Sequence, residues 1–321
     1  MMVARSAGSV APDRNSVVTV GTFDGVHLGH RVILDKVVTE ARRAGGRAVV
    51  ITFDPHPKSV VGTVGEPVRV LTTPGERAGL LEGLGIDLLV ILPFTREFSR
   101  QTAREFVSGQ VAGAVGARHV VVGHDHHFGR EREGGIEELE RLGTEFGFTI
   151  ERIPAFTLDG QVVSSTTIRA ALAEGDIRRA NGQLGRRYTL QGRVVDGDKR
   201  GRTLGFPTAN LEPSHPGKMI PGRGVYVVAA AFDGIRRYGM MNIGVRPTVG
   251  MGLEETYEVH LLEFEGDVYG HTLTVEFISR LREERRFPSL QDLVDQIRRD
   301  LEASLAVIKE FEEHHSQNHI S

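Results

Sequence analysis

The fold is decided near the N-terminus by the stretch Val17-Val-Thr-Val-Gly-Thr-Phe-Asp-Gly-Val-His-Leu-Gly-His30. Its apolar first half predicts a buried strand, and Asp24-Gly25 predicts a turn. A stripe of apolar residues at helical spacing follows, formed by Ile33, Leu34, Val37, Val38 and Ala41. Strand, turn and helix in this order indicate one unit of a parallel sheet.

The same alternation continues along the chain to about residue 184. Short apolar runs at 48–53, 86–94, 119–123 and 148–154 predict further buried strands. Thr102-Ala-Arg-Glu105 is a capping box that opens another helix. Repeated strands and helices predict a parallel sheet covered on both faces, which binds ligands beyond the carboxyl ends of its strands.

The pattern changes after Gly185, where turn signals become frequent and helical periods disappear. Strand-like runs at 188–195, 225–232, 256–264 and 273–278 predict a small antiparallel β-barrel. Ser289 then opens a terminal helix. The fold class is therefore α/β plus β, with a disordered tail at 1–15, an α/β domain at 16–184 and a barrel domain at 185–321.

The composition excludes several classes of protein. A formal net charge of −3 in 321 residues leaves no basic footprint, so nucleic acid is not an expected partner. No run approaches the roughly 20 apolar residues of a membrane helix. The absence of cysteine excludes disulfides, thiol catalysis and thiolate metal sites. We expect a cytoplasmic protein that contacts neither nucleic acid nor membrane; the oligomeric state is not predicted.

The first candidate site follows the first strand. His27 and His30 are three residues apart near a helix start and so lie on about the same side. Gly29 lets a phosphate approach the backbone, and the helix N-terminus supplies unpaired N–H groups. The two imidazoles can donate hydrogen bonds to phosphate oxygens as charge develops. A zinc-like pair or two structural histidines are the alternatives, although no third or fourth metal ligand is evident.

The second candidate site is the segment Gly192-Arg-Val-Val-Asp-Gly-Asp-Lys-Arg-Gly-Arg-Thr-Leu-Gly-Phe-Pro-Thr-Ala-Asn210. Its glycines allow a tight loop whose amides can lie near phosphates. Thr208 and Asn210 share one face of an extended segment, and their oxygens are hard ligands suited to Mg²⁺ carried by a nucleotide. A barrel turn with incidental polar residues is the alternative.

The blocks around these two sites carry a family resemblance. Gly21-Thr-Phe-Asp-Gly-Val-His-Leu-Gly-His30 is followed in order by Thr52-Phe-Asp-Pro-His-Pro57, Val121-Val-Gly-His-Asp-His-His-Phe-Gly129 and Ser164-Ser-Thr-Thr-Ile-Arg169. Pro207-Thr-Ala-Asn210 and Met241-Asn-Ile-Gly-Val-Arg-Pro-Thr248 stand in the second half. Together they resemble the bacterial bifunctional riboflavin kinase/FAD synthetases from Ser16 to about His314.

The resemblance implies a Rossmann-like nucleotidyltransferase domain followed by a riboflavin kinase barrel. It implies that ATP phosphorylates riboflavin to FMN and that a second ATP adenylylates FMN to FAD with release of pyrophosphate. The expected substrates are riboflavin, FMN and ATP, with Mg²⁺ accompanying ATP and no permanently bound cofactor. Two alternatives stay open: a working kinase alone, and a non-catalytic flavin- or nucleotide-binding regulator.

The resemblance also assigns residues to roles. His27, His30 and Glu258 match the catalytic groups, with Glu258 as the base that deprotonates riboflavin. ATP in the first domain is expected at Gly21, Phe23, Asp24, Gly29, Asp125, Ser165, Thr166 and Arg169. ATP and Mg²⁺ in the kinase are expected at Gly197, Lys199, Gly201, Gly205, Thr208 and Asn210, with the last two as metal ligands. Arg282 and Phe287 match flavin-covering residues.

Two departures from the family pattern concern the first site. His126 stands where relatives have an aromatic residue, and Val162 where they often have a basic one. Other interpretations also remain: Asp54 fits a turn, His124, His126 and His127 fit a metal site, and Glu258 fits a solvent-facing strand residue.

Overall fold

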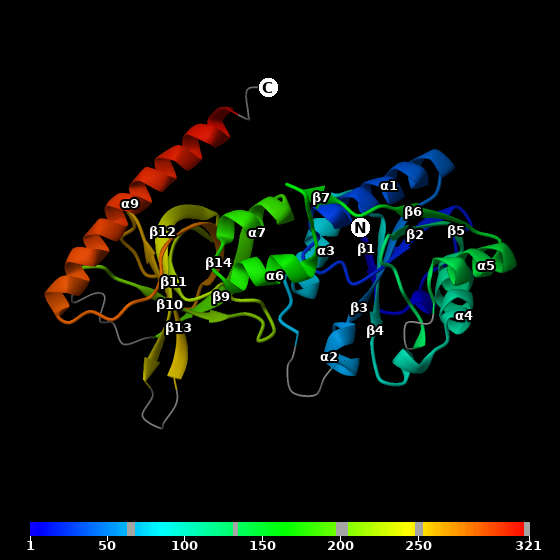
Figure 1. Ribbon diagram of the computed structural model, residues 1–321, viewed down its shortest axis with the longest axis horizontal. Coiled ribbons are helices and arrows are strands. Elements are labelled where there is room, and N and C mark those ends of the chain that lie inside the picture. The colour runs from blue at the N-terminus through cyan, green and yellow to red at the C-terminus, as the bar shows by residue number, and fades with distance from the viewer. Residues whose placement is uncertain (63–67, 131–133, 197–204, 248–252, 318–321) are drawn as a thin grey trace. The chain divides into compact units, whose positions relative to one another are not determined.

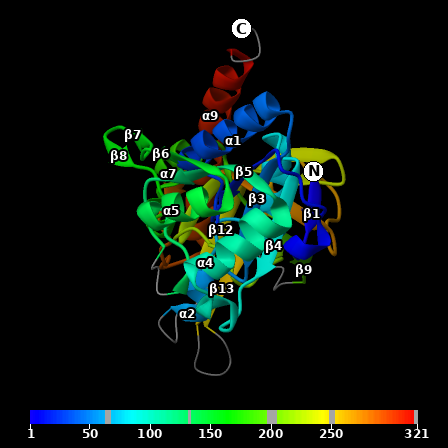
Figure 2. The same ribbon diagram turned by 90° about the vertical axis from the view of Figure 1, so that its right-hand side faces the viewer.

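The computed structural model of the chain describes residues 1–62, 68–130, 134–196, 205–247 and 253–317 (Figures 1 and 2). Contacts between residues divide it into two compact units, Met1–Thr167 and Ile168–Ser321. Within the described ranges, no helix combines the length and apolarity needed to cross a bilayer.

The first unit is built on a six-stranded sheet in the order β1-β4-β3-β2-β5-β6, with parallel pairing throughout the described residues. The strands are β1 (Met2–Ala4), β2 (Ser16–Val20), β3 (Ala48–Asp54), β4 (Leu88–Pro93), β5 (Ala117–Gly123) and β6 (Thr149–Ile153). The order runs outward from β2 in both directions, so the switch point lies between β2 and β5. This confirms the predicted parallel sheet.

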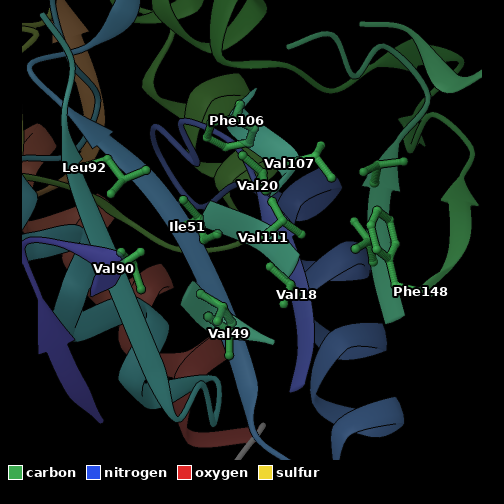
Figure 3. Packing of buried hydrophobic residues seen from close by; sticks show 14 of the residues in the cluster. Val18, Val20, Val49, Ile51, Val90, Leu92, Phe106, Val107, Val111 and Phe148 are labelled. Carbon is green, nitrogen blue, oxygen red and sulfur yellow. The ribbon is translucent and has the colours of Figure 1, made fainter. Parts of the chain in front are cut away.

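Helices cover both faces of this sheet because alternate residues of each strand point to opposite sides. One face carries Val17, Val50 and Leu89 against α1 (Leu28–Ala44) and α3 (Pro74–Gly83). The other carries Val18, Ile51 and Val90 against α4 (Ala103–Phe106), the π-helix η3 (Val107–Val115) and α5 (Ile136–Phe146). Figure 3 shows Val107 and Val111 of η3 packed over Val18 and Ile51. The sheet is thus buried on both sides, as the continuous apolar runs predicted.

Shorter elements complete the first unit. They are η1 (Ala7–Ser9), α2 (Pro57–Val61), η2 (Phe98–Arg100) and the hairpin of β7 (Thr157–Leu158) and β8 (Gln161–Val162). The helix predicted at Thr102 begins with the expected capping box, since Thr102 accepts from the Glu105 N–H and the Glu105 carboxylate accepts from the Thr102 N–H. α6 (Ser165–Ala173) begins in the first unit and ends in the second.

The N-terminal residues differ from the disordered tail that the sequence predicted. Met2–Ala4 pair with Leu88–Val90 as an edge strand, and Ala4, Ala7 and Val10 are buried against the core. These small apolar residues recur every three positions, which gives a narrow buried stripe. Their low individual hydrophobicity is the reason that the composition failed to indicate order.

The second unit is a closed antiparallel barrel in the order β10-β13-β12-β11-β14-β9, which confirms the predicted barrel. Its strands are β9 (Tyr188–Val195), β10 (Ala209–Pro213), β11 (Gly224–Phe232), β12 (Ile235–Pro247), β13 (Leu253–Leu261) and β14 (Thr272–Arg282). Tyr226, Met241 and Val259 lie side by side in the register and are buried. The residues that alternate with these along each strand therefore point to the outer face of the barrel.

Two helices pack on the outside of the barrel. α9 (Leu290–Gln317), coloured red in Figure 1, contacts β11, β12 and β14 through Ile308 and Leu301. Ser289 caps its first turn by accepting from the Asp292 N–H at 3.2 Å. α7 (Ile177–Leu184), which the sequence grouped with the first domain, contacts β9 and β14 of the second unit.

Candidate active sites

The first site lies where β2 passes into α1, beside the switch point of the sheet. The loop 21–27 follows β2, and the loop 124–127 follows β5, its neighbour. Ligands of open α/β sheets bind at this position, because the chain leaves the carboxyl ends of the two neighbouring strands towards helices on opposite faces and a crevice remains between the loops.

The backbone of the 23–26 loop is held in an unfavourable conformation. Phe23 and Val26 have φ of 45° and 42°, a left-handed region that costs a non-glycine residue about 1–3 kcal/mol. Asp24 between them is fully buried, and its carboxylate accepts hydrogen bonds from the N–H groups of Leu71 and Thr72 at 2.9 and 3.0 Å. Asp24 therefore anchors the loop to residues 71 and 72. The resemblance assigned this carboxylate to ATP binding, but here it is engaged in these hydrogen bonds.

The anchored loop places His27 as the N-cap of α1. Its Nδ1 accepts from the His30 N–H at 3.3 Å, so neutral His27 carries its proton on Nε2. The rings of His27 and His30 stack with centroids 3.6 Å apart and planes at 17°. The spacing predicted that these rings lie on one side, and they do.

His30 is held in its neutral form. Burial lowers the pKa of His30 well below its usual value, and the nearby His27 and Arg77 lower this pKa further. Its Nδ1 is buried and has no hydrogen-bond partner within the described ranges. A neutral imidazole can still donate one hydrogen bond to a phosphate oxygen.

The remaining residues predicted for this site have varied surroundings. The Ser165 hydroxyl donates to the Asp24 carbonyl at 2.8 Å, which ties the start of α6 to the loop. A Cβ on Gly29 would lie 3.3 Å from the His27 ring, which is closer than most Cβ contacts, so glycine leaves room for this ring. Phe23 meets His30 edge-on at 5.1 Å. Gly21 is half-buried, whereas Thr166 and Asp125 are exposed. Arg169 lies in α6 within the second unit.

The two departures from the family pattern are both visible. The His126 ring stacks on Phe128 with centroids 5.5 Å apart and planes at 26°. The His126 ring therefore packs on the aromatic cluster described below. Val162 is exposed in the β7–β8 hairpin.

An aromatic cluster at the carboxyl edge of the sheet was missed by sequence reasoning. Phe53 contacts Phe94, Phe98 and Phe106 with ring centroids 5.5–6.3 Å apart, and Phe106 contacts Phe128 at 6.2 Å. Of these five phenylalanines only Phe106 is fully buried. The sequence contained one indication of this cluster, because Phe53 and Phe94 each stand at the carboxyl end of a predicted strand.

A cavity of about 370 Å³ opens beyond β5, between its loop and the start of α5. Its lining includes His124, His126 and His127, the residues for which metal binding was an alternative. In the part of the chain that the structure describes, no group of three or more His, Asp or Glu side chains is placed to hold a metal ion.

The second site lies on the outer face of the barrel. Glu258 of β13 stands directly opposite Asn210 of β10 on one side and Asn242 of β12 on the other. Side chains opposite one another in antiparallel strands have Cβ atoms about 4.5–5.5 Å apart. Asn242 in turn faces Val225 of β11, which faces Arg282 of β14. One row of the sheet thus unites Asn210, Glu258 and Arg282, and adds Asn242, which sequence reasoning gave no role.

The segment before β10 is fixed to the same face. His260 Nδ1 lies 2.7 Å from the Pro207 carbonyl, and the Phe206 ring meets His260 edge-on at 5.7 Å. Thr208 is therefore held close to β13, and both Thr208 and Asn210 are half-buried. Gly205 has φ of 81°, a value that suits glycine. Gly197, Lys199 and Gly201 lie outside the described residues.

The other end of the row is supported by α9. Arg282 donates to the Asp300 carboxylate through Nε at 3.0 Å and Nη2 at 2.8 Å, and Asp300 is buried. Gln296 Nε2 donates to Asp300 at 2.7 Å. The Phe287 ring lies 5.7 Å from the Arg282 guanidinium and 5.0 Å from that of Arg285. Arg282 and Phe287 are therefore neighbours, as their predicted common role requires.

Comparisons with known proteins agree across both halves. A family model described as FAD synthetase matches residues 9–167, and one described as riboflavin kinase matches residues 184–308. The chain is 39% identical to a bifunctional riboflavin kinase/FMN adenylyltransferase of Pseudomonas fluorescens, over 96% of this chain and 98% of the relative. It is 39% identical to the protein so described in Escherichia coli K12, over 91% and 92%. A crystal structure described as a macrolide-efflux protein from Streptococcus pneumoniae is 31% identical, with a TM-score of 0.85 and coverage of 94% and 98%.

Proposed function

Because the chain belongs to the bifunctional riboflavin kinase/FMN adenylyltransferase family, we propose that its two activities reside in the two sites described above. The chain phosphorylates riboflavin to FMN and adenylylates FMN to FAD. Matches to both family models argue against a kinase alone and against a regulator without activity. We assign the adenylyltransferase to the first unit and the kinase to the second, so that α7, which the sequence grouped with the first domain, belongs with the kinase.

The register of the barrel carries the kinase assignment, because it places Glu258 directly opposite Asn210. In this proposal Glu258 takes the proton of the riboflavin 5′-hydroxyl. The 5′-oxygen bonds to the γ-phosphorus of ATP, the bond to the β–γ bridging oxygen breaks, and ADP leaves. Arg282 and Phe287 cover the flavin at the other end of the same row.

Thr208 and Asn210 fit a magnesium–nucleotide complex, because both offer neutral oxygen ligands beside the base. Mg²⁺ bound with ATP would neutralise charge on the phosphates during transfer. The backbone of Gly205 is proposed to contribute to the phosphate loop; Gly197, Lys199 and Gly201, predicted for the same role, lie outside the described residues.

The stacked histidines support the adenylyltransferase assignment. An oxygen of the FMN phosphate attacks the α-phosphorus of ATP, the α–β bridging bond breaks, and pyrophosphate leaves. His27 and His30 donate hydrogen bonds to the phosphate oxygens as negative charge develops. Thr166 and the loops containing Gly21, Phe23, Gly29 and Asp125 are proposed to surround the triphosphate. Arg169, which lies in the second unit, stays a prediction from the sequence. Asp24 and Ser165 would act by fixing the loop.

The aromatic cluster at the edge of the sheet suits the flavin of FMN. The isoalloxazine ring is flat and aromatic, and offset or edge-on contacts with phenylalanine rings favour such a ring. Phe98 is half-buried and contacts Phe53, Phe94 and Phe106.

We expect Phe98→Ala to raise KM for FMN in FAD formation by about three- to tenfold, the size of one aromatic contact, while the KM for riboflavin stays the same. Steady-state kinetics with each flavin measure both values. Phe146→Ala, a change to a half-buried ring of α5 outside the cluster, is the matched control. An unchanged KM for FMN would remove the cluster from the flavin site.

A chromatographic time course tests the proposed function as a whole. With riboflavin, ATP and Mg²⁺, we expect FMN to appear first and FAD to follow it. Chelation of Mg²⁺ should stop FMN formation, because the γ-phosphate then lacks its neutralising charge. FMN without FAD would contradict the assignment of the first unit and direct attention to His126 and Val162.

A further inference from the structure

Arg77 is a buried cation in the first unit that the proposed mechanism does not use. It lies in the first turn of α3, whose start is fixed by the capping box of Thr73 and Glu76. Only 4% of Arg77 is exposed. Burial of a charge is costly, and the N-terminal end of a helix disfavours a cation. Residues that break local rules in this way are expected at functional sites.

The contacts of Arg77 lead to the loop that carries the histidines. Nη1 donates to Thr52 Oγ1 at 3.1 Å, and Nη2 donates to the Thr72 carbonyl at 3.4 Å. The Thr52 hydroxyl donates in turn to the Thr22 carbonyl at 3.1 Å, and Thr72 Oγ1 accepts from the Gly25 N–H at 2.9 Å. Arg77 thus links the end of β3 to both sides of the strained 23–26 loop.

Arg77 has charged or titratable neighbours on the 23–26 loop, at the end of β3 and at the start of α1. Asp24 of the loop and Asp54 at the end of β3 raise the pKa of Arg77, although burial lowers this pKa more strongly. The guanidinium stays protonated at neutral pH, since its usual pKa is far above 7. Its charge and that of His27 both lower the pKa of His30. Arg77 Nε is buried and has no hydrogen-bond partner among the described residues, which is uncommon for a buried donor.

We infer that Arg77 is a positioning residue for adenylyl transfer, which holds the 22–27 loop, and with it the stacked histidines, through Thr52 and Thr72. This inference rests on the proposed role of His30. A merely structural arginine would fix the loop without affecting the protonation of His30, so the two roles differ in their pH dependence.

The test compares Arg77→Met with Arg77→Lys in the full-length enzyme, with FAD formation followed from pH 5.5 to 8.5. Misplacement of catalytic groups by about 1 Å can cost about 10²-fold, so we expect Arg77→Met to lower kcat for FAD formation by about 10- to 100-fold. Burial and His27 still lower the pKa of His30 in this variant, but loss of the Arg77 charge raises this pKa in part. Imidazolium then forms at a higher pH, and the acid limb of the profile moves to higher pH. Arg77→Lys keeps the charge, so the acid limb of its pH profile should lie where the wild-type limb lies. Its rate of FAD formation should stay below the wild-type rate.

Two controls accompany these variants. Arg42→Met removes an exposed arginine that pairs with Asp87, and it should leave FAD formation unchanged. FMN formation by the second unit should also be unchanged in every variant. In a His30→Ala background, Arg77→Met should add less than about a threefold loss, because residues that act through one another are not additive.

Specific results would overturn the inference. An equal loss at every pH, with the acid limb unmoved, would leave Arg77 a structural residue. A full additional loss in the His30→Ala background would show that Arg77 does not act through His30. If His30→Ala alone leaves FAD formation intact, the proposed function of the site fails first, and this result is distinguishable from the other two.

A second variant keeps the test decisive if Arg77→Met does not fold. Thr52→Val removes the Nη1 acceptor and preserves the guanidinium, so it should lower the rate of FAD formation without moving the acid limb. A shifted limb in Thr52→Val, or an unmoved rate, would contradict the inference.

Discussion

Replacement of His30 by alanine is expected to reduce FAD formation by about 10²-fold or more while FMN formation proceeds at the normal rate. The reason is that a preorganised donor beside a developing oxyanion contributes on this scale, and His30 is stacked on His27 at the start of α1. Purified variant supplied with riboflavin, ATP and Mg²⁺ should accumulate FMN, and chromatography would measure both products.

The matched control for this variant is His119→Ala. His119 lies near the start of β5, at the opposite end of the strand from the loop 124–127, and contacts Thr149 and Glu151. Its loss should leave both products unchanged. If His30→Ala instead reduced FMN formation as well, in protein with normal far-ultraviolet circular dichroism, the assignment of one activity to each unit would be wrong.

Glu258→Gln should have the opposite effect. Loss of a general base typically costs about 10²- to 10⁴-fold, and glutamine keeps the shape of the side chain without its capacity to take a proton. We expect FMN formation to fall within this range, whereas FMN supplied directly is still converted to FAD. Initial rates measured with riboflavin and with FMN separate the two steps.

Glu276→Gln is the corresponding control in the barrel. Glu276 lies on β14 and forms an ion pair with Arg236, so its replacement leaves the proposed row intact. A normal rate of FMN formation in Glu258→Gln would show that Glu258 is not the base and that another group accepts the proton.

Much of the fold could be predicted because its signals are local. The run 188–195 was predicted with the bounds that β9 has, since apolar and polar residues alternate along it. β12 was missed because Arg236 and Arg237 stand near its start and Gly239 and Gly244 interrupt it, so no apolar run marks the strand. The N-terminal strand was missed because its contribution comes from pairing with β4, which composition does not report.

The candidate sites could be predicted only in part, for a similar reason. His27, His30, Thr208 and Asn210 belong to compact motifs whose spacing is informative by itself. Arg77 stands in Pro-Gly-Glu-Arg, which reads as an exposed helix start, and nothing in the sequence indicates its burial. Asn242 gains its place beside Glu258 from strand register alone. Such residues become visible only when segments distant in sequence are brought together.

The buried Asp300 has a thermodynamic consequence for the end of the chain. Asp300 of α9 forms an ion pair with Arg282 at the end of the barrel row. If the flavin binds at Arg282 as proposed, the free energy of helix docking and the free energy of flavin binding are coupled. Linkage makes such coupling reciprocal. A flavin that engages Arg282 would therefore make α9 harder to detach, and loosening of α9 would weaken flavin binding by the same factor. If the flavin binds at Arg282 as proposed, α9 would influence its binding through the Asp300 carboxylate without contacting the flavin.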